Sequence, residues 1–396
     1  MGIVGSRVAV IGGSIAGCAA AIALARAGCD VTVFERTQGV LRDRGFGIGM
    51  PPSMIDTLSA AGYVGPGLPV VPGEERVFVV RDGDSRTGRV LWRQPLPVHF
   101  TNWSLLWRSL RQQVADPVYR DGVIAVIEDM DDRGVTVSAG ASAGMRFDLV
   151  VGADGYASAV RQRVAPGSLP HLPGYALWRG TYPEHLLPDG ATAALEPGAM
   201  MVCFPGGHAM IYLIPDHLHA GRRLVHWGVY LWPPRPVADP ALIPPGHVPA
   251  ELMIALRDAV TGSFPPLWAD VVGRTPAERI SVQPIFDVIT PQYVSGRLAL
   301  AGDAGTTARP HTGSGAVKAL EDALALESGC GAATEWASAL AGYERARTSA
   351  GNALTALGRS LGRALVENTP EWSAMSETDV PEWWREAASG RLSLYE

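Results

Sequence analysis

Residues 12–17 read Gly-Gly-Ser-Ile-Ala-Gly, and this segment directly follows a short apolar run, Arg7–Ile11. A turn of this kind between a strand and a helix brings small residues and the free N–H groups of the helix N-terminus to the diphosphate of a dinucleotide. Glu35 follows about 20 residues later, at the distance from which a carboxylate accepts the ribose hydroxyl groups of an adenosine. The alternative is a glycine turn without a ligand. The residues that we expect to contact a dinucleotide here are Gly12, Ser14, Ile15, Ala16, Gly17, Glu35 and Arg36.

A second group of polar residues lies far along the chain, near residue 303. Asp303 follows the apolar run Arg297–Ala301, and a carboxylate at the carboxyl end of a central strand can accept sugar hydroxyl groups. The alternative is that this carboxylate caps the helix that follows. The next segment, Ala308–Gly315, leads into a helix whose N–H groups would stabilise negative charge on a ligand. We expect ligand contacts from Pro310, Gly313, Ser314 and Gly315, and from His311, a loop histidine that could otherwise face solvent.

Histidine, tyrosine, tryptophan and arginine side chains are frequent between residues 178 and 230. Alternation along a strand places Tyr212 on one face of its strand, and it places His226 and Tyr230 together on one face with Trp227 on the other. Only one face of such a sheet can line a pocket, and each side chain taken alone is better explained by packing. We therefore choose no catalytic base. The catalytic candidates are His208, Tyr212, His226 and Tyr230, and the substrate-binding candidates are Trp178, Arg179, Tyr212 and His311.

The elements that must position these residues form two kinds of unit. Residues 7–35 read as strand, turn, helix and strand, and Phe147–Val151 and Arg297–Ala301 read as further buried strands, which predicts a Rossmann-like α/β domain. Prolines, aromatics and alternating strands between about 166 and 280 predict an inserted antiparallel β-sheet. We expect a discontinuous first domain at 1–75, 100–165 and 281–330, a substrate-binding sheet domain at 76–99 and 166–280, and a C-terminal helical region at 331–396.

Composition excludes several classes of protein. The 396-residue chain is 47% hydrophobic, which allows a large core and about two or three structural units. A formal net charge of −6 without a basic stripe argues against a nucleic acid partner. The four cysteines lack the paired spacing of a zinc or iron–sulfur site, so no metal is expected. No segment reaches the roughly 20 apolar residues that span a bilayer, and we expect a cytoplasmic protein without a membrane partner.

Three motifs together carry a resemblance to a known family. Asp154–Arg161 resembles the Asp-Gly motif, and Gly296–Ala304 resembles the Gly-Asp motif, of the class A flavoprotein monooxygenases, which include the aromatic hydroxylases. With the glycine turn, they occur in the family's order and cover most of the chain. The Gly-Gly-Ser-Ile turn, the Pro-His entrance to a helix and the segment Thr101–Leu110 are similar to the 2,6-dihydroxypyridine hydroxylase-like subgroup. Trp103 stands where many other members have arginine.

The resemblance implies FAD bound in the discontinuous domain, with NAD(P)H and O₂ as cosubstrates and a flavin C4a-hydroperoxide that hydroxylates a small aromatic or heteroaromatic substrate. It implies that Asp303 contacts the ribityl and diphosphate region, and that Asp154 and Arg161 serve the cofactor domain and the pyridine nucleotide. Arg44 matches a family position beside the isoalloxazine or its phosphates, with a solvated surface arginine as the alternative. Arg108, in the segment shared with the subgroup, is a further expected cofactor contact. A homodimer is also expected.

Two other functions would use the same FAD motifs. A flavin oxidase or dehydrogenase would remove a hydride from its substrate, and an oxidase would form peroxide without NAD(P)H. A non-catalytic flavin-binding module would hold FAD without substrate-stimulated turnover, and Trp372, Trp383 and Trp384 in the tail would be its interaction surface. A flavin-dependent halogenase is disfavoured because the chain has no Trp-x-Trp-x-Ile-Pro segment.

Overall fold

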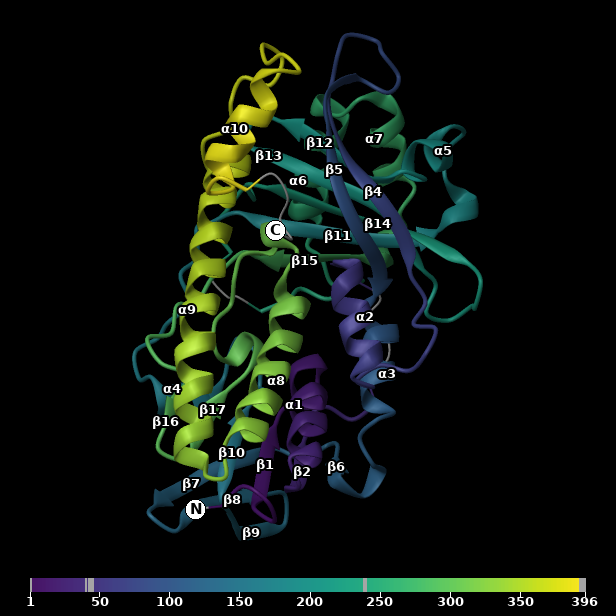
Figure 1. Cartoon of the computed structure of the whole chain (residues 1–396). Coiled ribbons are helices and arrows are strands. Elements are labelled where there is room, and N and C mark those ends of the chain that lie inside the picture. Colours follow the sequence, from purple (N-terminus) through teal and green to yellow (C-terminus); the bar gives the residue numbers. More distant parts are fainter. Residues whose placement is uncertain (1, 40, 42–45, 238–240, 392–396) are drawn as a thin grey trace.

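The computed structural model describes residues 2–39, 41, 46–237 and 241–391. Two large β-sheets occupy the two ends of the elongated molecule, and long helices run along one side of it (Figure 1). Arg44 lies outside the described residues, so its predicted contact with the cofactor stays a prediction.

The glycine turn belongs to a six-stranded sheet that is parallel except at one edge. In spatial order its strands are β16 (Val294–Ser295), β17 (Leu298–Leu300), β10 (Leu149–Gly152), β1 (Arg7–Ile11), β2 (Asp30–Phe34) and β6 (Tyr119–Arg120). In the centre, Val10 of β1 lies opposite Val33 and Val151, and all three are fully buried, as expected for parallel strands covered on both faces. Parallel strands end at one edge of the sheet, so the residues that follow β1, β2, β10 and β17 come together there.

Helices of small and apolar residues cover this sheet. α1 (Ile15–Arg26) packs between the sheet and α8 (Gly315–Ala332), and α9 (Trp336–Gly362) packs against α8. The alanine-rich sequence of α1 allows this close approach, because most of its residues are small and those from Ile15 to Leu24 are buried. Three shorter helices complete the unit: α2 (Pro52–Ala60), α3 (Trp103–Arg111) and α4 (Ala159–Val164).

The second sheet has eight strands and is antiparallel except for the pair β12–β4. Its strands, in spatial order, are β15 (Ile280–Pro284), β11 (Ala176–Pro183), β14 (Arg223–Leu231), β13 (Gly207–Pro215), β12 (Gly198–Phe204), β4 (Val71–Val80), β5 (Arg89–Asn102) and β3 (Gly47–Met50). One face packs on α6 (Ala250–Ser263) and α7 (Pro266–Gly273) and buries Trp178 and Trp227. We call this the outer face and the opposite one the inner face.

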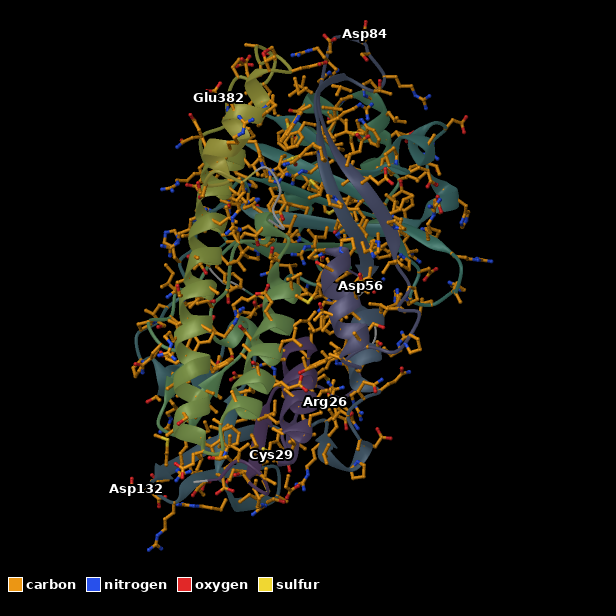
Figure 2. The ribbon with its side chains drawn as sticks, in the orientation of Figure 1. Arg26, Cys29, Asp56, Asp84, Asp132 and Glu382 are labelled. Atoms are coloured by element: carbon orange, nitrogen blue, oxygen red, sulfur yellow. The ribbon has the colours of Figure 1, made fainter. Side chains whose placement is uncertain are left out.

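The C-terminal tail docks on the chain. Beyond α9, residues Arg363–Glu367 continue as a π-helix, and α10 (Asp379–Ala387) packs against β4 and β5. Trp384 of α10 is fully buried beside Phe78 and the Arg76 guanidinium, and Trp372 is also buried. Glu382 points outward from the same helix (Figure 2). Two of the three tail tryptophans are therefore part of the core and cannot form an exposed interaction surface.

A third, smaller sheet lies between α3 and β10 in the chain. β7 (Ala125–Asp131), β8 (Gly134–Ala139) and β9 (Ser142–Phe147) form a small antiparallel sheet beside the parallel one. Phe147 packs edge to face on Phe34 of β2, with 6.1 Å between ring centroids. A short helix, α5 (Ala191–Leu195), precedes β12.

The predicted fold, a Rossmann-like domain with an inserted, mostly antiparallel sheet and C-terminal helices, is confirmed. Helices α6 and α7 in the inserted region were not expected from the sequence. The larger sheet also takes in β3 and the first half of β4, which precede the segment predicted to open it, and the predicted domain boundaries stay a prediction. Among the described residues, no helix is both long and apolar enough to span a membrane.

Candidate active site

The glycine turn is held in one conformation by close contacts. Gly12 has φ +104°, and a Cβ on Gly17 would lie 1.8 Å from the Gly12 carbonyl oxygen, so both positions require glycine. The Gly13 carbonyl accepts hydrogen bonds from Trp107 Nε1 and Tyr119 Oη, both at 2.9 Å. Ser14 is the N-cap of α1, and its side chain does not cap the helix. The N-terminal N–H groups of α1 are therefore left for a ligand.

Glu35 follows β2 and lies beside this turn. Its carboxylate accepts hydrogen bonds from the N–H groups of Gly13, at 2.7 Å, and Thr37, at 2.8 Å. Each carboxylate oxygen has a second lone pair, so the group can also accept ribose hydroxyl groups. Arg36, the next residue, is exposed at the end of β2.

Asp303 is exposed at the same edge of the sheet, in the turn after β17. Arg161 of α4 is buried and reaches across to this turn, where Nη1 donates to the carbonyl oxygens of Asp303 and Ala304, both at 3.2 Å. A further hydrogen bond joins its guanidinium to the Tyr156 carbonyl. The Asp-Gly and Gly-Asp motifs thus contact each other directly, and the first holds the backbone of the second.

A buried ion network holds the other side of the Asp303 turn. Asp322 of α8 is fully buried and accepts hydrogen bonds from Gly302 N at 2.8 Å, Lys318 Nζ at 2.9 Å and Arg347 Nε at 2.6 Å. Lys318 Nζ also donates to the Gly302 carbonyl at 2.8 Å. The peptide groups on both sides of Gly302 are therefore fixed by two charged side chains. We did not identify this network from the sequence, although a Lys and an Asp four residues apart in an apolar helix are a signal for it.

The N-terminus of α8 is the second helix end at this edge. Gly313, just before it, has φ +63°, and Ser314 turns its hydroxyl to the Thr312 carbonyl instead of capping the helix. A Cβ on Gly315 would have open space around it. Pro310 opens the short turn that precedes these residues. The N–H groups at the start of α8 thus face an open region.

These features fit FAD. Two uncapped helix N-termini supply N–H groups for anionic or polar edges of a ligand, and Glu35 and Asp303 supply acceptors for hydroxyl groups at the same edge of the sheet. Ile15 and Ala16 lie in the first turn of α1, and a Cβ on Gly302 would lie 2.6 Å from the Cβ of Ala16. The two motifs therefore pack against each other as well as around the ligand.

Asp154 and Arg108, two predicted cofactor contacts, form hydrogen bonds with other residues of the chain. Asp154 accepts hydrogen bonds from Ser158 Oγ at 2.5 Å and Ala159 N at 2.8 Å, so its carboxylate caps the start of α4. Arg108 donates to the His217 carbonyl at 3.4 Å. Asp154 nevertheless follows β10 directly beside Gly12, and the predicted cofactor contacts of Asp154 and Arg108 stay predictions.

The predicted catalytic candidates meet on the inner face of the second sheet. His208 stacks on Tyr230 with 4.5 Å between ring centroids, and His226 lies 5.1 Å from Tyr212. We call this set the aromatic face, and it consists of Arg179, His208, Tyr212, His226 and Tyr230. Trp178 is not part of it, because it lies on the outer face, where it is fully buried and donates to the Leu252 carbonyl.

His311 joins the aromatic face to the α8 loop. Its ring is buried, lies 4.4 Å from Tyr230 between centroids, and shares a 2.7 Å hydrogen bond between Nε2 and Tyr175 Oη. The expected alternative, a solvent-facing loop histidine, is therefore not observed. Arg309 donates to Tyr175 Oη at 3.3 Å and pairs with Asp287 at 2.9 Å, so a buried polar network continues behind His311. Tyr175 was not singled out from the sequence, which gives no signal for this partner.

Burial keeps the histidines of this region neutral. Removal from water, with a smaller contribution from Arg76, lowers the pKa of His208 to about 3, and removal from water with a contribution from Arg179 lowers the pKa of His226 to about 3. Burial also lowers the pKa of His311 well below its ordinary value. These rings can therefore donate or accept hydrogen bonds but carry no charge near neutral pH.

A cavity of about 930 Å³ borders the aromatic face. Phe46 and Thr181 line it, and the Phe46 ring also covers the Arg179 guanidinium at 5.0 Å. Its rim carries charged and imidazole side chains from β13, β14 and the segments beside them, including His217 and Arg222. The volume falls in the range of sites for small organic ligands.

Comparison with known proteins agrees with this geometry. Residues 7–63 match the family model described as pyridine nucleotide-disulphide oxidoreductase. The chain is 27% identical over 332 residues to a 2,6-dihydroxypyridine 3-monooxygenase from Paenarthrobacter nicotinovorans, and the match covers 81% of each protein. The resemblance to the class A FAD-dependent monooxygenases, and to their dihydroxypyridine hydroxylase-like members, is confirmed.

Solved structures share the fold over nearly the whole chain. The structure of 2,6-dihydroxypyridine-3-hydroxylase from Arthrobacter nicotinovorans superposes with a TM-score of 0.81 at 24% identity, covering 94% of this chain and 96% of that one. Klebsiella pneumoniae HpxO, complexed with FAD and uric acid, superposes with a TM-score of 0.75 at 22% identity, covering 97% and 93% of the two chains. Both superpositions agree with the fold described above.

Proposed function

We propose that this class A flavoprotein monooxygenase uses NAD(P)H and O₂ to hydroxylate a small aromatic or heteroaromatic substrate. The observation that carries the proposal is the position of the aromatic face. His311, in the loop that enters α8, contacts Tyr230 and His208 of the inserted sheet, so the cofactor-binding edge of one unit meets the polar, aromatic inner face of the other. A substrate between them would be enclosed from both sides.

FAD would be held by the residues at the edge of the parallel sheet. We assign the diphosphate to the turn of Gly12, Ser14 and Gly17, the adenosine ribose to Glu35, and the ribityl region to Asp303. The N-terminus of α8, entered by Pro310 to Gly315, would face the flavin ring. Bound FAD supplies electron transfer from NAD(P)H and the activation of O₂.

The protein's own task is to enclose and orient the substrate. The stacked rings of His208 and Tyr230 form a flat surface suited to an aromatic ring, and aromatic pairs of this kind are worth about 0.5–1.5 kcal/mol beyond burial. Burial on this face excludes water, which protects an activated oxygen from side reactions. His226 and His311, neutral and buried, each have a ring nitrogen without a protein partner among the described residues and can hydrogen-bond a substrate.

The test starts with the absorbance spectrum of the purified protein. We expect flavin bands, and NAD(P)H oxidation that accelerates when a phenol, hydroxypyridine or indole is added. Mass spectrometry of the product should show one added oxygen atom. Flavin-free protein that does not take up FAD, or NAD(P)H oxidation unaffected by every aromatic compound, would refute the proposal.

A flavin oxidase or dehydrogenase is the second candidate function, because it would use the same FAD site. It predicts flavin reduction by substrate alone and peroxide formation without NAD(P)H, whereas the monooxygenase consumes NAD(P)H. A homodimer and a cytoplasmic location also stay predictions; light scattering on the purified holoenzyme tests the first, and fractionation of producing cells tests the second.

A further inference from the structure

Arg179 is a cation without an anion. It lies on β11 in the middle of the aromatic face, with Tyr212, His226 and Tyr230 around it, and its guanidinium rests on the Phe46 ring at 5.0 Å. No acidic side chain of the described residues forms an ion pair with it. Other buried arginines of this chain do have polar partners: Arg309 pairs with Asp287, Arg347 pairs with Asp322, and Arg161 donates to backbone carbonyl oxygens. A half-buried guanidinium without an ion-pair partner among the described residues is costly unless a ligand completes it.

Ser281 gives the second, independent observation. It lies directly opposite Arg179 in the register of β15 with β11, and side chains at opposed positions of antiparallel strands point to the same face. Its neighbours Ile280 and Val282 belong to the core of the outer face, so Ser281 points to the inner face with Arg179. The Ser281 hydroxyl is buried, with 1% of the residue exposed, and has no hydrogen-bond partner among the described residues. Buried hydroxyl groups are rarely left in this state without a ligand or water.

A third buried polar group without a hydrogen-bond partner among the described residues lies on the same face. His226 Nδ1 is buried without a partner among the described residues, and the Phe46 ring that covers Arg179 also packs against the His226 ring at 6.4 Å. The cavity of about 930 Å³ reaches this place at Phe46 and Thr181, and Thr181 points to the same face of β11 as Arg179. Phe46, whose ring contacts both Arg179 and His226, thus forms part of the wall between these groups and a space that a small molecule can enter.

From these observations we propose that Arg179 and Ser281 form an anion subsite that binds a carboxylate on the aromatic substrate, so that the substrate is an aromatic acid. Guanidinium donors match the two oxygens of a carboxylate, and a serine hydroxyl can donate to one of them. The rest of the ring would then lie on the His208 and Tyr230 surface, toward His311. This inference rests on the proposed function, and it adds the charge and the orientation of the substrate.

The test uses the FAD-loaded enzyme and matched pairs of acids and their carboxamides. We would titrate benzoate, salicylate, anthranilate and 4-hydroxybenzoate, each against its amide, and follow the change in flavin absorbance. We expect at least one acid to bind about 10- to 100-fold more tightly than its amide, since hydrogen bonds to charged groups contribute more than neutral ones. Arg179→Gln should remove this preference, Arg179→Lys should keep part of it, and Ser281→Ala should weaken acid binding several-fold.

Arg257→Gln is the matched control. Arg257 lies on α6 at the outer face, and its one ion pair among the described residues is with the exposed Asp258. Its substitution should leave every titration unchanged. A stability measurement adds a second readout. Without substrate, Arg179→Met should unfold at the same or a higher temperature than the wild type, because it removes a cation without a partner, and benzoate should raise the melting temperature of the wild type alone.

The outcomes separate this inference from the proposed function. Acids and amides that bind equally, an acid preference that survives in Arg179→Gln, or no acid that binds at all would each overturn the anion subsite. An enzyme that binds FAD and oxidises NAD(P)H faster with neutral phenols than with any acid would overturn the subsite and leave the monooxygenase intact. If Arg179→Gln weakens NAD(P)H binding but not acid binding, the anion held there is a phosphate of the nucleotide, and the inference is wrong.

Discussion

We expect the conformation of the Asp303 turn, at the edge of the parallel sheet where FAD would bind, to depend most strongly on Asp322. It is fully buried, and it accepts hydrogen bonds from two cations, Lys318 and Arg347, and from the Gly302 N–H that begins the Asp303 turn. Asp322→Ala would leave both cations without this partner and the Gly302 N–H without its acceptor. Arg347 also pairs with Glu321 at 2.9 Å, whereas the ion pair of Lys318 among the described residues is with Asp322.

The structure allows the size of the effect to be worked out. Removing one partner of a buried ion pair costs about 3–5 kcal/mol, because the remaining charge stays buried. At about 2.1 cal/mol/K of unfolding entropy per residue, this loss lowers the melting temperature of a 396-residue chain by roughly 4 to 6 °C. The affinity for FAD should fall as well, because the Asp303 turn loses the contact that fixes its first peptide group. Asp322→Asn should be milder for the turn, since an amide oxygen can still accept from Gly302 N.

The assay is thermal unfolding with and without added FAD, together with a fluorescence titration of the apoprotein with FAD. Asp258→Ala, at an exposed position of α6, is the control and should change the free energy of unfolding by less than about 0.5 kcal/mol. The reasoning is refuted if Asp322→Ala melts within 1 °C of the wild type, or if it loses stability while its FAD affinity is unchanged.

Three further predictions concern the described contacts. Because the pKa values of His208 and His226 are lowered to about 3 in the folded chain, unfolding takes up protons below pH 6.5, and the free energy of unfolding should fall by about 1.4 kcal/mol per pH unit for each histidine as the pH decreases. Melting temperatures at pH 7 and pH 5 measure this slope, which should shrink in the double His→Asn variant. Gly17→Ala places a Cβ 1.8 Å from a carbonyl oxygen and should lose most of its flavin absorbance, whereas Gly331→Ala, with open space around it in α8, should keep it and gain up to about 1 kcal/mol. Arg161→Met removes the donor to two carbonyls of the Asp303 turn and should raise the dissociation constant of FAD about tenfold; an unchanged constant would contradict the described role.

The parallel sheet and its cofactor edge could be predicted because their signals are local. The apolar run before Gly12, the acid after β2 and Asp303 after β17 each follow from a few neighbouring residues, and strand order then brings them to one edge. Asp154 shows the limit of this reasoning. A carboxylate that ends a strand and precedes a helix can serve either a ligand or the helix, and here Ser158, Ala159 and Val160 donate hydrogen bonds to it.

The aromatic face could be predicted only in part, because its composition depends on register. Alternation correctly grouped His226 with Tyr230, but Trp178 and Arg179 are adjacent in β11 and point to opposite faces, and the sequence does not reveal which of them faces inward. Ser281 becomes a candidate only when β15 pairs with β11, a contact between segments far apart in the chain. Tyr175 and His311 likewise meet through tertiary packing alone.

Helix α9 connects the two halves of the molecule and limits how far they can move apart. It is a single 27-residue rod, about 40 Å long at 1.5 Å per residue, whose first half packs on α8 and whose second half enters the core under the inserted sheet through Leu357 and Leu361 (Figure 1). Its Arg359 is tied to Asp287 at 2.6 Å. A hinge motion that separated the two halves would have to pull α9 out of one of these cores, so we expect substrate entry and product release to depend on the loops around the cavity instead.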